Sequence, residues 1–155
     1  MACLLVTPLH ASLLSKSDGA VIPQPRLDLH PEDVVRIVIN ALANNDQPYP
    51  NAGIETTFAF ASPANKVNTG PLEKFTRMVK GPPYGIMVDH VKSEFSELVH
   101  VDNKAYQMVQ LTARDGRAVV FAFRLSRQAD GEFEDMWMTD AVWPVNNTVL
   151  PQKGF

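Results

Sequence analysis

Apolar residues recur at helical spacing in three segments of the first half of the chain, residues 28–43, 53–61 and 71–80. In the first of these, Val34 and Val38 belong to a stripe that repeats every three to four residues. This is the pattern of a helix with one buried face. Each segment ends at asparagines, prolines or a glycine, which stop helices. The pattern therefore predicts three helices in this half.

After Tyr84 the spacing changes to alternation, which is typical of half-buried strands. Asp115-Gly116 and Asp130-Gly131 separate the last three alternating runs. Such pairs favour two-residue hairpin turns, because both central positions need a positive φ. The expected fold class is α+β, with three N-terminal helices packed on the concave face of a curved antiparallel sheet of about five strands. These strands are predicted at residues 86–91, 94–101, 105–113, 117–128 and 134–145.

If both turns are two-residue hairpins, the pairing register of the strands follows by counting residues outward from each turn. Arg114 would face Arg117, so Gln110 would lie opposite Phe121, and Phe121 would lie opposite Asp140 across the second turn. Directly opposed residues share one face of a sheet. The face toward the helices is then expected to hold a pocket next to Asp140. Its predicted lining residues are Tyr84, Tyr106, Met108, Gln110, Phe121, Phe123 and Met138.

The opposite face of the predicted sheet is too apolar to be freely solvated. A partner subunit would cover it most simply, so we expect a homodimer or a complex subunit joined through this outer face. The alternative is that the N-terminal segment folds back over it. A one-residue bulge would exchange the two faces. The predicted interface residues are Val109, Leu111, Val120, Arg124, Trp137 and Trp143.

Composition and charge exclude several classes of function. The 155 residues carry 14 Lys plus Arg against 17 Asp plus Glu, a net charge of −3, which lacks the electrostatic footprint of a nucleic-acid binder. The single cysteine, Cys3, cannot form an internal disulfide, and no apolar run approaches the ~20 residues of a membrane span. His90 and His100 match no standard metal-ligand spacing. No phosphate loop or dinucleotide fingerprint is present, so we expect neither a metal nor a cofactor.

The chain divides into three parts by composition. Residues 1–27 are expected to be a flexible N-terminal or targeting segment, because they contain prolines and serines but no acid before Asp18. A transit segment would place this soluble protein in a plastid, and a plain tail would leave it in the cytoplasm. Residues 28–145 form the predicted domain, and residues 146–155 a loose C-terminal tail.

One hexapeptide, Phe58-Ala59-Phe60-Ala61-Ser62-Pro63, is the most specific part of a wider resemblance. With residues 75–79, Tyr84 and residues 140–143, it resembles a family of unknown function found in bacteria and photosynthetic eukaryotes. The wider pattern of three N-terminal helices followed by a paired antiparallel sheet, over roughly residues 29–145, resembles the nuclear-transport-factor-two-like superfamily, the cystatin-like α+β cone, and this family lies within it. The resemblance implies a pocket at the open end of the cone and dimers packed through the outer sheet face.

Members of this superfamily include ketosteroid isomerases, polyketide cyclases and dehydratases, but also non-enzymatic modules, so the fold does not decide the function. Burying a carboxylate on an apolar face costs free energy unless the carboxylate is paired or hydrated. A carboxylate in such surroundings is suited to general acid–base catalysis. Asp140 is therefore the candidate catalytic base, with Tyr106 or Gln110 as a polar partner. No Tyr and Asp pair matches the pattern of the isomerases, however. We therefore expect a non-enzymatic interaction or small-ligand-binding module, which would take a small apolar ligand, and we keep a small isomerase, cyclase or dehydratase as the alternative.

Overall fold

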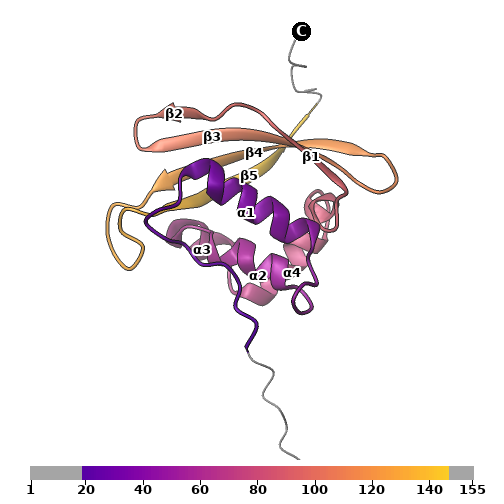
Figure 1. The fold of residues 1–155 in the computed structure, drawn as a ribbon, viewed down its shortest axis with the longest axis horizontal. Coiled ribbons are helices and arrows are strands. Elements are labelled where there is room, and N and C mark those ends of the chain that lie inside the picture. The colour runs from indigo at the N-terminus through magenta and orange to yellow at the C-terminus, as the bar shows by residue number, and fades with distance from the viewer. Residues whose placement is uncertain (1–18, 147–155) are drawn as a thin grey trace, which may run out of the picture.

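The computed structural model describes residues 19–146, and in this range the helices lie against one face of an antiparallel sheet (Figure 1). The helices are α1 (Pro31–Ala43), α2 (Ala52–Ala59), α3 (Pro63–Thr69), α4 (Leu72–Lys80) and the 3-10 helix η1 (Tyr84–Met87). The strands are β1 (Lys92–Phe95), β2 (Val99–Val101), β3 (Lys104–Thr112), β4 (Ala118–Arg127) and β5 (Trp137–Val145). The predicted α+β class and the five-stranded sheet are confirmed.

The sheet has the order β1-β3-β4-β5, and β2 pairs with the same strand, β3, as β1 does. No helix within residues 19–146 is long and apolar enough to cross a membrane. Most of the predicted N-terminal segment, residues 1–27, and of the predicted C-terminal tail, residues 146–155, lies outside the described residues.

The first helix forms where its apolar stripe predicts it. Val34, Val38 and Ile39 of α1 are at most 1% exposed, and α1 contacts β3 and β5. At its start the carboxylate of Asp33 accepts a hydrogen bond of 2.9 Å from the backbone N–H of His30. This is half of a capping box, which fixes where the helix begins. The apolar stripe therefore determines where α1 forms and which face of α1 packs against the sheet.

The first and second helices meet at a glycine. Gly53 of α2 lies so close to α1 that a Cβ built on it would be 2.1 Å from the carbonyl oxygen of Ala41. The buried side-chain Oδ1 of Asn45 accepts a hydrogen bond of 3.0 Å from the backbone N–H of Ile54. The backbone carbonyl of Asn45 accepts a second bond, of 2.9 Å, from the backbone N–H of Gly53. Asn45, just after the end of α1, thus caps the start of α2. The close spacing of the two helices depends on the absence of a side chain at Gly53.

A fourth helix, α3, was not predicted. Ser62-Pro63 ends the preceding segment as expected, but it also starts α3, because the Ser62 hydroxyl accepts a hydrogen bond of 3.2 Å from the N–H of Asn65. None of the seven residues of α3 is buried. The helix therefore lacks the apolar stripe on which the prediction relied. The strand predicted at 86–91 is also wrong, since most of that segment forms η1 and a turn at Asp89, whose φ is 55°.

The first hairpin turn has one residue more than predicted. Ala113 pairs with Arg117 through a hydrogen bond of 2.8 Å, which leaves three residues, 114–116, in the loop. Gly116, with a φ of 88°, takes the left-handed position that closes such loops. The register between β3 and β4 is therefore shifted by one residue from the prediction.

This shift exchanges the two faces of β3. Val109 and Leu111, predicted on the outer face, are fully buried in the core toward the helices. Tyr106, Met108 and Gln110, predicted to line the pocket, pair with Arg124, Ala122 and Val120 and lie on the outer face. The predicted assignment of these five residues is thus wrong, because side chains alternate with a period of two.

The second predicted hairpin is replaced by a long connection, residues 128–136. The register of β4 and β5 also shifts between Arg124 and Leu125, so that Leu125 pairs with Thr139 and Phe123 with Val142. Asp140 is the extra residue at this bulge and does not face Phe121. Asp140 is thereby placed next to Thr139, at the point where the ladder is interrupted.

The free edge of β5 is tied to the helical layer. The N–H of Thr139 donates to the carbonyl of Phe60, and the N–H of Ser62 donates to the carbonyl of Thr139, both at 2.8 Å. These two bonds make a parallel bridge between Ala61 and Thr139. The hexapeptide 58–63 is therefore the segment that joins α2, α3 and the sheet.

We expect Gly53→Ala to lower the free energy of unfolding. Alanine is favoured over glycine in a helix by about 1 kcal/mol, but forcing a methyl group into a tight backbone contact costs typically ~1–3 kcal/mol. The contact at 2.1 Å places this case at the costly end, so the steric term exceeds the gain in propensity. Urea denaturation followed by circular dichroism measures the difference. Gly19→Ala is the control, because nothing lies within 4 Å of its Cβ position; equal stability of the two variants would contradict the packing described.

Candidate functional site

A cavity of about 320 Å³ lies between the helices and β5. The sheet contributes Phe123, Val142 and Thr139, whose register places them on the face toward the helices. The volume is roughly twice the ~150 Å³ of an engineered cavity that holds benzene. The apolar lining residues on the helical side are Val38, Leu42, Ala61, Phe75, Met78, Val79 and Met87. The cavity is thus large enough for a small ligand with an apolar body.

Thr139 supplies an unused hydrogen-bonding group to the cavity wall. Its side chain is 5% exposed, and its hydroxyl has no hydrogen-bond partner among residues 19–146. Because Thr139 pairs with the core residue Leu125, its side chain faces the helices. Burying a hydroxyl without a partner is unfavourable, so this group favours a polar atom in the cavity.

The unpredicted helix α3 forms a polar side of the same cavity. Asn65 donates from Nδ2 to the carbonyl of Thr139 at 3.1 Å, and the hydroxyl of Thr69 lies 2.9 Å from the backbone carbonyl oxygen of Asn65 and 3.3 Å from its Oδ1. Asn68 and Thr69 line the cavity beside it. Sequence reasoning missed these residues because α3 has no buried stripe. The signal that was available is the capping pattern of Ser62-Pro63 with Asn65.

On its other side α3 is held by Lys66. The Nζ atom lies 5.4 Å from the ring centre of Phe58 and 5.3 Å from that of Phe133, and it donates to the carbonyl of Ala59 at 3.3 Å. Burial lowers the pKa of Lys66, and the nearby Glu132 opposes this shift. Lys66 thus joins α3 to the 128–136 connection, outside the lining of the cavity.

Asp140 also lines the cavity, as the extra residue of the β5 bulge. The ion pairs within residues 19–146 involve Asp28, Glu94, Asp115 and Asp135, so none of them compensates Asp140. Its carboxylate likewise makes no hydrogen bond to another described side chain. The cavity wall therefore carries a carboxylate with free acceptor positions.

Tyr84 lines the cavity, but its hydroxyl is occupied. The hydroxyl donates to the carbonyl of Val142 at 3.0 Å, and the ring stacks on Phe121 with centres 6.2 Å apart. Tyr84 thus holds η1 against β5 and closes one side of the cavity. Its phenol is not free to act on a ligand in this arrangement.

The structure brings together only some of the predicted site residues. Tyr84, Phe123 and Asp140 line the cavity, whereas Phe121 and Met138 are buried outside its lining. The three remaining candidates, Tyr106, Met108 and Gln110, lie on the opposite face of the sheet, where Gln110 bonds Glu94 at 3.2 Å. The polar partners proposed for Asp140 are therefore not beside it.

The predicted interface residues are divided in the same way. Val120, Arg124 and Trp143 lie on the outer face as expected from their register, and Trp143 is 40% exposed. Trp137 pairs with Arg127 instead of Arg124, and it is a partly buried residue packed against the core. Its ring also meets the edge of His100 at 5.7 Å. Trp137, like Val109 and Leu111, is thus no part of the outer face.

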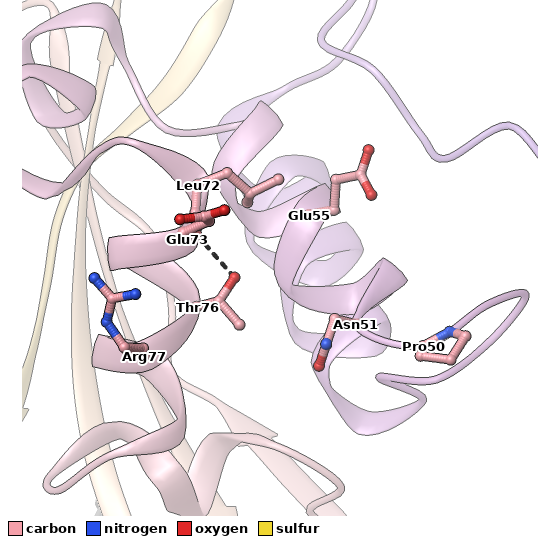
Figure 2. Close-up of a pocket in the computed structure, with 7 residues that line it drawn as sticks. All are labelled: Pro50, Asn51, Glu55, Leu72, Glu73, Thr76 and Arg77. Atoms are coloured by element: carbon pink, nitrogen blue, oxygen red, sulfur yellow. Dashed lines mark hydrogen bonds between the residues drawn. The ribbon is translucent and has the colours of Figure 1, made fainter.

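A second hollow, of about 410 Å³, lies between α4 and the loop that leads into α2 (Figure 2). Two of its polar side chains, Thr76 and Glu55, are bonded within the protein, while Glu73 and Arg77 take part in none of the ion pairs of residues 19–146. Thr76 donates to the carbonyl of Leu72 at 2.8 Å, and Glu55 accepts from the hydroxyl of Tyr49 at 2.9 Å. Burial, followed by the contact with Glu55, raises the pKa of Tyr49. This hollow therefore differs from the cavity beside β5 in being lined mostly by polar and charged side chains.

Histidines and carboxylates do not gather into a metal site in residues 19–146. His90 is buried with its Nδ1 atom 2.7 Å from the carbonyl oxygen of Met87, and His100 is exposed on β2. The two histidines therefore have separate surroundings.

A family model described as a domain of unknown function (DUF4864) matches residues 28–148. The chain belongs to this family. The DUF4864 segment contains the helices and strands described above, and thus the whole cavity beside β5. No curated protein and no solved structure matches the chain.

We expect Thr139→Val to raise the free energy of unfolding by about 1 kcal/mol. The substitution keeps the shape of the side chain and removes a buried hydroxyl, whose burial without a partner costs ~1–3 kcal/mol. Thr56→Val is the matched control, since Thr56 is equally buried but donates to the carbonyl of Ala52 at 2.8 Å. That variant should be neutral or lose about 1 kcal/mol. Equal losses in both variants, measured by urea denaturation, would mean that the Thr139 hydroxyl is satisfied.

Proposed function

We propose that this DUF4864 domain is a small-ligand-binding module, and that its site is the cavity beside β5. The observation that carries the proposal is the combination of an apolar lining of about 320 Å³ with the unpartnered Thr139 hydroxyl. Mostly apolar cavities with a few polar groups are the usual form of small-molecule sites. The polar groups fix the orientation of a ligand, and the apolar walls supply most of its affinity.

We further propose that the domain is a member of the nuclear-transport-factor-two-like superfamily. The layer of N-terminal helices on one face of an antiparallel sheet supports this, as does the position of the cavity between the two layers. Because that superfamily contains enzymes and binding modules alike, the proposal adds nothing to the choice between them.

The arrangement around Asp140 favours binding over catalysis. A general base needs a second group that stabilises the charge formed on the substrate. Tyr106 and Gln110, the partners expected for that role, lie on the other face of the sheet, and the Tyr84 hydroxyl is bonded to Val142. An isomerase, cyclase or dehydratase activity would therefore lack its expected second group.

We expect Val142→Phe to abolish binding of a small apolar probe such as phenylbutanol. Val142 pairs with Phe123 on the face toward the helices, so the larger side chain would fill part of the cavity. Isothermal titration calorimetry measures the affinity. Val21→Phe is the control, because it makes the same change at a residue that is 86% exposed and lies outside the lining of the cavity. Unchanged binding in Val142→Phe, or no binding by the parent protein, would contradict the proposal.

We also propose that the module forms a homodimer through the outer sheet face. Apart from Gln110 and Arg124, the nine central positions of this face are apolar or aromatic, and no helix covers them in the described part of the chain (Figure 1). Uncovered apolar faces of this kind favour association. The nine positions form three rows across β3, β4 and β5: Gln110–Val120–Val145, Met108–Ala122–Trp143 and Tyr106–Arg124–Ala141.

We expect Trp143→Lys to convert the dimer into a monomer. Trp143 is 40% exposed in the central row, and a lysine there would place a charge in the desolvated middle of the interface. Light scattering on the full chain gives the mass. Val67→Lys is the control, since Val67 is 83% exposed but lies on α3, in the helical layer on the other side of the sheet. A monomeric parent protein, or a variant that stays dimeric, would contradict the proposed interface.

A further inference from the structure

Hydrogen-bonding groups at the cavity divide into those bonded within the protein and those left over. The hydroxyl of Tyr84 donates to the carbonyl of Val142, and the side-chain amide of Asn65 donates to the carbonyl of Thr139. Within residues 19–146, the Thr139 hydroxyl, the Asp140 carboxylate and the buried Nε atom of Arg124 have no such partner. Thr139 and Asp140 are consecutive, so the two leftover acceptors lie at one place on the wall, at the β5 bulge.

The leftover groups match a ligand that donates hydrogen bonds. A carboxylate only accepts them, while a hydroxyl accepts and donates. A ligand ammonium would therefore find two acceptors, one of them charged, whereas a ligand carboxylate would face the like charge of Asp140. Arg124 is the other charged lining residue, but it pairs with Tyr106 and Ala141, and its side chain belongs to the outer face.

The remaining, apolar lining residues determine the size and polarity of the part of the ligand that carries no hydrogen-bonding group. Phe75, Met78 and Phe123 are typical of the large apolar side chains that surround the cavity. The volume of about 320 Å³ exceeds by roughly twofold the ~150 Å³ that accommodates benzene. A phenyl ring with a short alkyl chain fits a space of this size.

From these observations, and resting on the ligand-binding function proposed above, we propose that the cavity binds a small hydrophobic amine in its ammonium form. The N–H groups of the ammonium donate to the Asp140 carboxylate and the Thr139 hydroxyl. The apolar body lies against the side chains of α1, α4 and β4. The ligand class is therefore an arylalkyl or alkyl amine, not a fatty acid or another anion.

Three probes with the same phenylbutyl body test this inference, namely phenylbutylamine, phenylbutanol and phenylbutyrate. They are titrated into the full chain at neutral pH by isothermal titration calorimetry. We expect the amine to bind about tenfold more tightly than the alcohol, the ratio typical of a hydrogen bond to a charged group. The carboxylate should bind most weakly. Equal affinities for the three probes, or tightest binding of phenylbutyrate, would overturn the inference.

Asp140→Asn should bring the affinities of the amine and the alcohol to within about twofold of each other. Asp130→Asn is the matched control, because it removes the same charge from the exposed 128–136 connection. It should keep the tenfold preference, which would exclude an effect of net charge. An unchanged preference in Asp140→Asn, with the fold verified by circular dichroism, would also overturn the inference. If none of the probes binds the parent protein, the ligand-binding function itself fails; if the alcohol binds but the amine has no advantage, only this inference fails.

Discussion

The two backbone hydrogen bonds between the hexapeptide and Thr139 are the constraint on which the rest of the site depends. Both measure 2.8 Å, and together they pair the backbone N–H and carbonyl of Thr139, which the free edge of β5 would otherwise leave unpaired. Because Ser62 also caps α3, the same few residues fix where that helix starts relative to the sheet. The distance between α3 and β5, and with it the width of the cavity, is therefore set by backbone pairing and not by side-chain packing alone.

The helices and strands with strong periodicity were predictable from the sequence, and the connections between them were not. α1 carries a continuous buried stripe, so its pattern alone reveals it, whereas α3 buries none of its residues and gives no such signal. The Asp115-Gly116 pair correctly marks a turn, but both two- and three-residue loops use a glycine with positive φ. The choice between them moved the register by one residue and exchanged the faces of β3.

The candidate site was predicted in part, and partly for the wrong reason. Asp140 lines the cavity, although the register that first suggested it is incorrect; the bulge beside Leu125 brings it there. Thr139 was missed because the predicted register of β5 did not include the bulge, and Asn65 because α3, whose start the capping pattern of Ser62-Pro63 marks, has no buried stripe. Tyr84 and Phe123 were found because large aromatic residues in a core-facing position tend to border any space left between two layers.

The bulge at Asp140 gives the two halves of β5 independent phases of side-chain alternation. Before the bulge, Thr139 faces the helices, and after it, Trp143 faces away from them. Without the bulge at Asp140, strict alternation would place both side chains on the same face. An insertion or deletion at this point would realign one half against the other, turning a cavity wall outward or an exposed tryptophan inward. Substitutions within either half carry no such penalty. The two halves of β5 can therefore diverge separately among relatives, as long as the length of the strand across the bulge is kept.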